Sequence, residues 1–269
     1  MHATIFALLA AVNVVKDVAY GVDVAGGKHR LDVYAPMGAR AAPVLMFVYG
    51  GGFVQGDRRD YNGLAVAIAA TGIVVVVPSY RLFPQTDARG AASDVAAAIA
   101  WTVKHVARYG GNPNSVVLSG HSSGAYLATL VGYDPEFLSA DGISVKVIRG
   151  IAGFSGVYDM RDFAPDSSAA DIQILQRFFG ATREARTAIS PITYVSRASP
   201  PTVLFCGGIY DASACAQRDQ LFAALVGVGA TVEMDSDPSA THIGVVANLS
   251  RNGTQEQRSL LDFVAKYGH

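Results

Sequence analysis

The residues best suited to chemistry lie in the segment 116–125. An apolar run at 116–118 leads into Gly-His-Ser-Ser-Gly at 120–124, and small residues follow. A serine hydroxyl is a weak nucleophile unless a sharp turn exposes it beside a base, and flanking glycines let the backbone make such a turn. The Gly-x-Ser-x-Gly pattern alone is a weak signal in a chain with 28 glycines. Its position between a buried strand and the start of a helix predicts that Ser122 is a nucleophile.

A serine nucleophile needs a general base, and position along the chain separates the six histidines. His2 and His269 are terminal, and His29 lies in an expected N-terminal hairpin. His105 is expected to face outward from a helix. His121 adjoins the serine, so its side chain should leave the turn in another direction. His242 remains, on the loop expected after the last strand, where mobile catalytic side chains are often found. We therefore expect His242 to be the base.

An acid that orients the imidazole should lie between the serine and the histidine in this chain order. Asp211, a few residues after a predicted strand at 202–206, is favoured. It would accept the second imidazole N–H, fix the tautomer and stabilise the imidazolium. Asp235 and Asp237, expected just after the last strand, remain alternatives, whereas Asp219 is expected in solvent. A glycine-flanked aspartate can also simply form a turn.

Three glycines, Gly50 to Gly52, follow a predicted buried strand at 44–48 through Tyr49. Glycines here let backbone N–H groups approach a developing oxyanion, where each well-placed donor is worth about 3 kcal/mol. The N–H of Ser123, the residue after the predicted nucleophile, would supply a further donor. A plain tight turn is the alternative, but the downstream Ser, Asp and His favour an oxyanion hole.

The elements that must position these residues alternate between apolar strands and amphipathic helices. This pattern predicts an α/β fold with a mostly parallel sheet covered on both faces. Strands are expected at 18–20, 29–34, 44–48, 73–77, 116–119, 147–154, 202–206 and 231–234, and helices at 62–70, 91–109 and 256–267. The first two strands should form an edge hairpin through Gly26 and Gly27. The more polar stretch 160–191, with a helical piece at 171–179, is expected to form a small cap over the ligand-binding edge of the sheet.

Composition limits the class of protein. A length of 269 residues, 51% of them hydrophobic, suits one large domain over 1–269 with a well-buried core. A net charge of −1 without a basic run argues against a nucleic-acid partner. No apolar run approaches the roughly 20 residues that span a bilayer.

Two features of the sequence bear on the cellular compartment: the N-terminal apolar segment and the two cysteines. The apolar segment from Ile5 to Val15 lacks the positive residues that precede a signal-peptide core, so a short helix packed on the domain is expected. Cys206 and Cys215 are too few for a disulfide framework and are expected to be reduced, although a bond between them would staple the loop of Asp211. The cytoplasm is favoured, with a secreted or periplasmic location left open.

The order of glycine-rich loop, Gly-x-Ser-x-Gly, Asp and His resembles the α/β-hydrolase fold. It is closest to the small esterase/lipase branch related to hormone-sensitive lipase and arylformamidase. The resemblance covers much of the chain and is poor only over 160–191. Further matching segments are Asp17–Gly21, Leu31–Tyr34, Tyr49–Phe53, Pro78–Leu82, Arg108–Pro113 and His242–Gly244.

The resemblance implies a carboxylic ester hydrolase for small or short-chain acyl or aromatic esters, working through an acyl-enzyme and needing no cofactor or metal. Its implied triad is Ser122, Asp211 and His242, and its implied oxyanion donors are the N–H groups of Gly51, Gly52 and Ser123. Relatives usually have histidine where this chain has Tyr49. A tyrosine hydroxyl can also brace the loop, and Tyr49 and Phe53 are expected to contact substrate.

Two other functions remain open. An arylformamidase-like amide hydrolase or a peptidase would use the same triad, so the sequence does not separate these from an esterase. A hydrolase-fold binding protein without catalysis would be expected to lack a triad member. Every candidate member is present here, which disfavours that reading.

Overall fold

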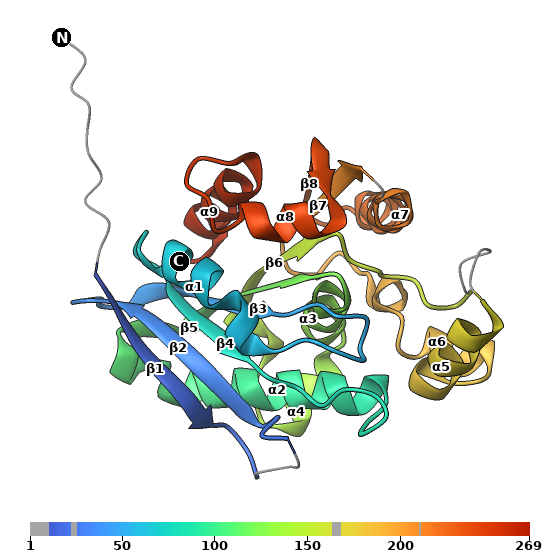
Figure 1. Cartoon of the computed structure of the whole chain (residues 1–269), viewed down its shortest axis with the longest axis horizontal. Helices are drawn as coiled ribbons and strands as arrows, with labels where there is room; N and C mark the ends of the chain where they lie inside the picture. The colour runs from blue at the N-terminus through green and yellow to red at the C-terminus, as the bar shows by residue number, and fades with distance from the viewer. Residues whose placement is uncertain (1–10, 23–25, 163–167, 210) are drawn as a thin grey trace.

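An eight-stranded sheet forms the centre of the computed structural model, which describes residues 11–22, 26–162, 168–209 and 211–269 (Figure 1). The strands are β1 (Val12–Ala19), β2 (Arg30–Pro36), β3 (Ala42–Val48), β4 (Val74–Pro78), β5 (Gly111–His121), β6 (Ile148–Phe154), β7 (Thr202–Ile209) and β8 (Val232–Thr241). Their order is β1-β2-β4-β3-β5-β6-β7-β8. Among these strands only β2 runs against its neighbours. The predicted α/β fold with a mostly parallel sheet is confirmed.

Helices cover both faces of the sheet (Figure 1). On one face lie α1 (Asn62–Ala69), α8 (His242–Asn248) and α9 (Gln255–Tyr267). On the other lie α2 (Ala88–His105), α3 (Ser123–Tyr133), α4 (Pro135–Ala140) and α7 (Ala212–Gly227). Alternate residues of β3 enter the two cores, Val44 and Met46 on one side and Leu45 and Phe47 on the other. Burial on both faces explains why this strand is a continuous apolar run.

The ends of the chain differ from the expectations at two places. The N-terminal helix expected over 5–15 is wrong over 12–15, because these residues pair with β2 as part of β1; residues 5–10 lie outside the described residues. Strand β8 is longer than expected and contains Asp235 and Asp237, so His242 begins α8 instead of lying on a loop. Pairing with β7 sustains β8 through polar residues that are poor strand formers by themselves.

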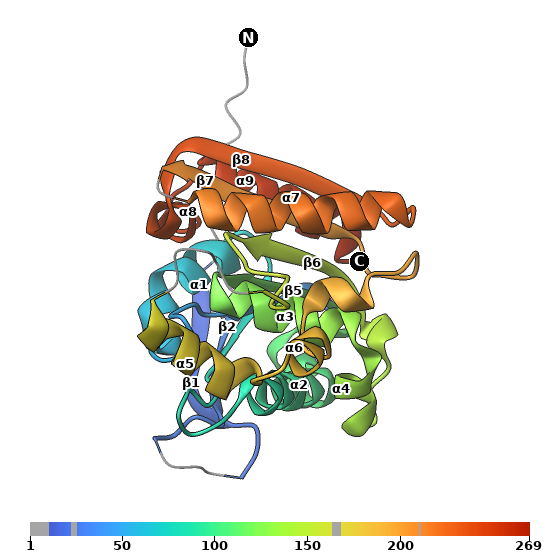
Figure 2. The ribbon, with the colours of Figure 1, turned by 90° about the vertical axis from the view of Figure 1, so that its right-hand side faces the viewer.

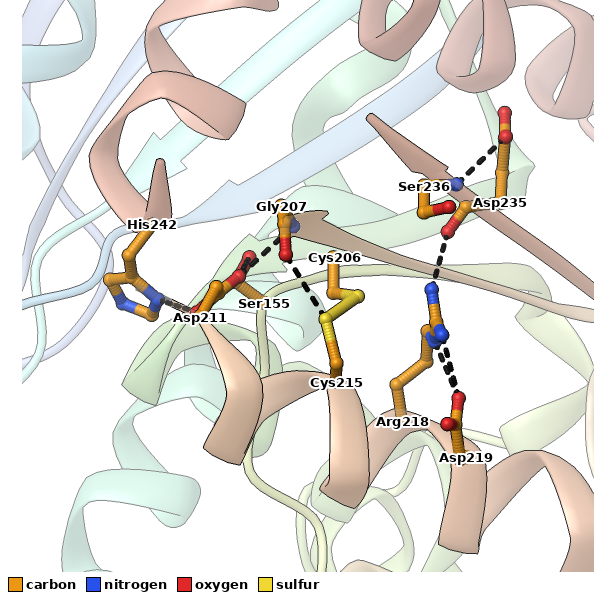
Figure 3. Close-up of a disulfide and its surroundings, with 10 residues drawn as sticks. All are labelled: Ser155, Cys206, Gly207, Asp211, Cys215, Arg218, Asp219, Asp235, Ser236 and His242. Atoms are coloured by element: carbon orange, nitrogen blue, oxygen red, sulfur yellow. Dashed lines mark hydrogen bonds and ion pairs between the residues drawn. A yellow bond between two sulfur atoms is a disulfide. The ribbon is translucent and has the colours of Figure 1, made fainter. Parts of the chain in front are cut away.

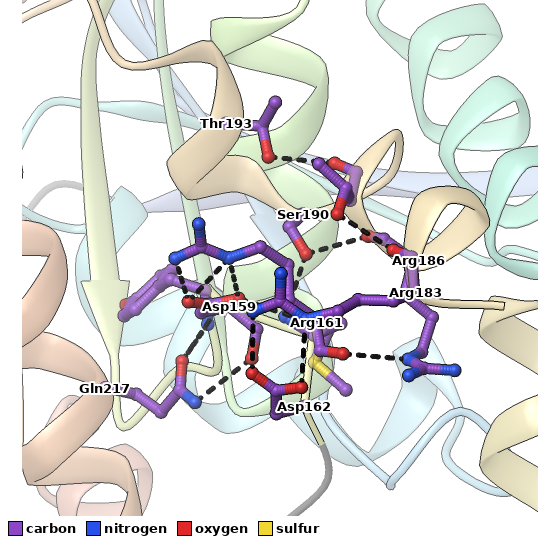
Figure 4. A network of polar contacts seen from close by, with 11 residues as sticks. Asp159, Arg161, Asp162, Arg183, Arg186, Ser190, Thr193 and Gln217 are labelled. Carbon is purple, nitrogen blue, oxygen red and sulfur yellow. Dashed lines mark hydrogen bonds and ion pairs between the residues drawn. The ribbon is translucent and has the colours of Figure 1, made fainter.

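The segment expected to form a cap contains α5 (Ala169–Phe179) and α6 (Arg183–Thr187), on the same side of the sheet as α2 and α3 (Figure 2). Phe178 and Phe179 pack on Phe53, with ring centroids 4.7 and 5.0 Å apart. A polar network links α7 to this segment (Figure 4). The N–H groups of Tyr158 and Asp159 donate to Gln217 Oε1 of α7, and Arg161 of the segment donates to the carboxylate of Asp159. These contacts attach the segment to the sheet's helical layer.

The start of α3 lies unusually close to the end of β3. A Cβ placed on Gly124 would be 2.1 Å from the carbonyl oxygen of Val48, and one on Gly120 would be 2.4 Å from the carbonyl carbon of Gly124. Both glycines of the Gly-x-Ser-x-Gly pattern are therefore required by close backbone packing, and this packing sets the position of the residues between them.

Gly124→Ala is expected to lower the free energy of unfolding by about 3 kcal/mol, because backbone must move to make room for the methyl group. Gly63→Ala in α1 is the matched control, since a Cβ there meets no atom within 4 Å. It should be neutral or stabilising by up to about 1 kcal/mol. Urea unfolding followed by circular dichroism measures both changes. Equal stability of the two variants would contradict the close approach of α3 to β3.

Candidate active site

Ser122 occupies a strained turn between β5 and α3. Its backbone has φ 54° and ψ −123°, a conformation that costs a non-glycine residue about 1–3 kcal/mol and is concentrated at functional sites. The turn is held by the N–H of Ser122, which donates to the carbonyl of Phe154 at 2.9 Å. The side chain lines a cleft of about 510 Å³. The structure thus presents the predicted nucleophile at an open surface.

The glycine loop supplies free donors to the same cleft. The N–H of Gly50 is occupied, donating to the hydroxyl of Tyr61 at 3.2 Å. Within the described part of the chain, the N–H groups of Gly51 and Gly52 have no hydrogen-bond partner. Gly51 has φ 141°, and a Cβ there would lie 2.1 Å from the carbonyl oxygen of Gln55. Glycine at this position allows the tight loop that leaves two neighbouring N–H groups free beside Ser122.

Tyr49 and Phe53 do not line the cleft, in contrast to the expectation that they contact substrate. The side chain of Tyr49 is fully buried and stacks on Tyr80, with ring centroids 4.4 Å apart. Each tyrosine hydroxyl donates to the backbone carbonyl of the other residue, at 3.3 Å from Tyr49 and 2.9 Å from Tyr80. Phe53 packs in the aromatic cluster with α5. Both residues therefore support the glycine loop from the protein interior. Tyr49 does so by its contacts with Tyr80, and Phe53 by its contacts with α5.

Asp211 and His242 form a close pair (Figure 3). Nδ1 of His242 lies 2.6 Å from Oδ1 of Asp211. The other carboxylate oxygen accepts from the hydroxyl of Ser155 at 2.5 Å and from the N–H of Gly207 at 3.0 Å. Burial by itself would raise the pKa of Asp211, but the hydrogen bonds from His242, Ser155 and Gly207 outweigh it and hold the pKa below its ordinary value. The carboxylate is therefore ionised at neutral pH, which suits an acceptor for imidazole N–H.

The other candidate acids lie elsewhere. Asp219 pairs with Arg218 on α7 (Figure 3). Asp235 accepts from Gln255. Asp237 accepts from Ser239. Of the four aspartates considered, the structure brings Asp211 to the histidine.

Ser122 and His242 line the same cleft, but no hydrogen bond joins the side chains of these two described residues. Catalytic hydrogen bonds are often long in a protein without ligand and tighten when substrate binds. The structure therefore brings the acid and the base into direct contact and places the serine in the lining of the same cleft as the base.

Two residues that sequence reasoning missed are part of the site. His121, set aside because it adjoins the serine, turns toward His242: its Nε2 lies 2.8 Å from the backbone carbonyl oxygen of His242. Burial, and then the neighbouring His242, lower the pKa of His121 to about 4, so it is neutral at neutral pH and donates through Nε2–H. Ser155 lies just after β6 and donates to Asp211. No sequence pattern marks it, and for His121 the one signal was adjacency to the serine.

Cys206 and Cys215 form a disulfide, which corrects the expectation that they are reduced (Figure 3). The bond joins β7 to α7 across nine positions of sequence. Gly207 and Asp211, which are hydrogen-bonded to each other, both lie between the two cysteines. The loop that carries the candidate acid is thus closed covalently at its base.

Residues 31–225 match the model of the BD-FAE family, which is well over half of the chain. The chain belongs to the BD-FAE family. The matched range contains the glycine loop, the serine turn and Asp211, and ends before His242. The family match therefore does not bear on His242, whose place in the site rests on its position in the sequence and on its contact with Asp211.

Curated relatives of this BD-FAE chain are esterases by name. Esterase LipQ of Mycobacterium tuberculosis is 31% identical over 245 residues, which is 84% of this chain and 56% of the relative. Isoprenylcysteine alpha-carbonyl methylesterase ICME of Arabidopsis thaliana is 27% identical over 80% of this chain and 54% of the relative. The chain spans about half the length of these relatives.

Solved structures share the fold. A truncated carbohydrate esterase from gut microbiota superimposes with a TM-score of 0.81 at 19% identity, covering 96% of this chain and 97% of that one. Esterase B from Lactobacillus rhamnosis gives 0.79 at 23% identity, covering 95% and 86%. The predicted resemblance to α/β-hydrolase esterases is confirmed.

Two further observations concern the described residues. None of their helices combines the length and apolar character needed to cross a membrane. No cluster of three or more His, Cys, Asp or Glu side chains among them is arranged to hold a metal ion.

The buried imidazole of His121 should make stability depend on pH between 6.5 and about 4. In that range the imidazole is protonated in the unfolded chain but not in the folded protein. The free energy of unfolding therefore falls as the pH drops from 6.5 toward 4. His121→Gln removes this titration, so the free energy of unfolding should fall by about 3 kcal/mol less on acidification in this variant than in wild type. Urea unfolding at pH 7 and pH 4.5 measures it. The terminal, exposed His269→Gln should behave like wild type, and an equal acid loss in both variants would refute the role of His121.

Proposed function

We propose that this protein is a serine carboxylic ester hydrolase for small or short-chain acyl or aromatic esters. The observation that carries the proposal is the contact of 2.6 Å between Asp211 and His242, because His242 lines the same cleft as the strained Ser122. Named esterases among the relatives support the same reaction class. A cleft of about 510 Å³ lies within the range typical of sites for small molecules.

The first half of the reaction forms an acyl-enzyme. Ser122 Oγ attacks the ester carbonyl carbon while Nε2 of His242 takes the hydroxyl proton, and Asp211 holds the imidazolium through Nδ1–H. The carbonyl oxygen becomes an oxyanion. The tetrahedral intermediate then collapses, the bond from carbon to the alcohol oxygen breaks, and His242 returns its proton to that oxygen.

The second half releases the acid. A water molecule replaces the alcohol, gives a proton to His242 and attacks the acyl carbon, and collapse of the second intermediate returns the proton to Ser122 Oγ. In both halves the oxyanion accepts from the N–H groups of Gly51, Gly52 and Ser123. The free state of the two glycine N–H groups supports this role, since each such donor is worth about 3 kcal/mol in the transition state.

The segment 160–191 is proposed to act as a cap that limits the acyl group. The aromatic cluster of Phe53, Phe178 and Phe179 fills the space between the glycine loop and α5. Space already filled by rings is not open to a long acyl chain, which supports small substrates.

The disulfide supports an oxidising compartment as the site of action, in place of the cytoplasm that the sequence favoured. Disulfides persist in secreted and periplasmic proteins and are rare where thiols are kept reduced. Because this bond closes the loop of Asp211, we also propose that it holds the acid in position for His242.

Ser122→Ala should lower kcat/KM for p-nitrophenyl acetate by at least about a thousandfold, because the attacking oxygen is removed. Ser139→Ala, on the exposed side of α4, is the matched control and should retain full activity. Wild type and the control, but not Ser122→Ala, should be labelled by a fluorophosphonate probe. An undiminished rate in Ser122→Ala would rule out the proposed nucleophile.

Reduction of the disulfide should lower kcat for p-nitrophenyl acetate about tenfold with little change in KM, since a shift of about 1 Å in a catalytic group can cost up to about a hundredfold. The double variant Cys206→Ser/Cys215→Ser should show the same low kcat and no response to dithiothreitol. Alkylation followed by mass measurement reports the redox state. Full activity of the reduced protein would remove the positioning role of the disulfide.

A further inference from the structure

The catalytic cleft continues into a second cavity of about 400 Å³ between α1 and α8. Five residues line both spaces, so the two form one continuous groove: Gly50, Gly56, Asp60, Tyr61 and Ile243. Gly63 and Leu64 of α1 and Val246 and Ala247 of α8 line the far part. The mechanism described above uses none of these far residues.

The transfer of a proton from His242 to the alcohol oxygen indicates which part of the ester lies in this groove. His242 must lie within hydrogen-bond distance of the alcohol oxygen to return its proton. Ile243, the next residue, is 65% exposed and lies where the cleft passes into the second cavity. The group attached to the alcohol oxygen therefore extends past Ile243 along α8, while the acyl carbon stays at Ser122.

We propose that the space lined by Gly63, Leu64, Val246 and Ala247 is an alcohol groove, which binds the leaving group of the ester. This inference rests on the proposed function and deepens it. Apolar walls from Leu64, Val246 and Ile243 favour an apolar or aromatic alcohol, since burial yields roughly 25 cal/mol per Å² of apolar surface.

Gly63→Trp tests the location of the groove. Gly63 is exposed and a Cβ there meets no atom within 4 Å, so a large side chain fits into open space. We expect kcat/KM for 2-phenylethyl acetate to fall at least tenfold, with methyl acetate and methyl butyrate changed less than twofold. Ala247→Trp, on the opposite wall, should have the same effect. Gly227→Trp, at an equally open position on α7, is the matched control and should change none of the three substrates.

The outcomes separate this inference from the proposed function. Failure of the wild type to hydrolyse methyl acetate would overturn the proposed function itself. Hydrolysis of methyl acetate, with Gly63→Trp and Ala247→Trp both equal to the control on 2-phenylethyl acetate, would overturn the alcohol groove alone. An equal fall on methyl and 2-phenylethyl acetate, or a fall confined to methyl butyrate, would also overturn it, because the blocked space would then not belong to the alcohol.

Discussion

The close approach of α3 to β3 is the constraint on which the site depends. Only hydrogen atoms on Gly120 and Gly124 permit it, since a Cβ on Gly124 would be 2.1 Å from the carbonyl oxygen of Val48. β3 and β5 are neighbours in the sheet, and their paired residues end with Val48 beside Gly120. The glycine loop and the serine turn therefore leave the sheet side by side. The close backbone contact between α3 and β3 therefore positions both the proposed nucleophile and the proposed oxyanion donors.

Parallel pairing extends the same arrangement across the sheet. Five neighbouring strands, β3, β5, β6, β7 and β8, end at one edge, and each is followed by a residue of the candidate site. In strand order these are Gly51, Ser122, Ser155, Asp211 and His242. Residues far apart in the chain meet because the carboxyl ends of parallel strands point the same way.

The sequence carried most of this information, and the exceptions have physical reasons. Buried strands were predictable because burial on both faces produces apolar runs, and the chain order of Ser, Asp and His limited the candidates. The length of β8 was not predictable, since its polar half is stabilised by pairing with β7. The positions of His121 and Ser155 depend on contacts with His242 and Asp211, which sequence spacing does not report.

The bond between Cys206 and Cys215 was also beyond the sequence, because whether two cysteines nine positions apart meet depends on how the chain turns between them, here from β7 into α7. Tyr49 was expected to contact substrate, with a hydroxyl able to donate and accept at the head of the loop, and its side chain is buried against Tyr80. Its hydroxyl reaches a backbone carbonyl of the neighbouring strand's exit, and nothing in the order of residues reveals that the ring faces inward.

Tyr49 stands at the head of the glycine loop, where the resemblance implies a histidine, and this has a consequence for charge. A histidine brace would gain or lose a proton near neutral pH, and the field at the oxyanion would change with it. Burial raises the pKa of Tyr49 and of Tyr80 above the ordinary value, and burial lowers that of His121 to about 4. Tyr49, Tyr80 and His121 therefore stay uncharged through the neutral range, so these three side chains add no pH-dependent charge to the surroundings of the glycine loop and the serine turn.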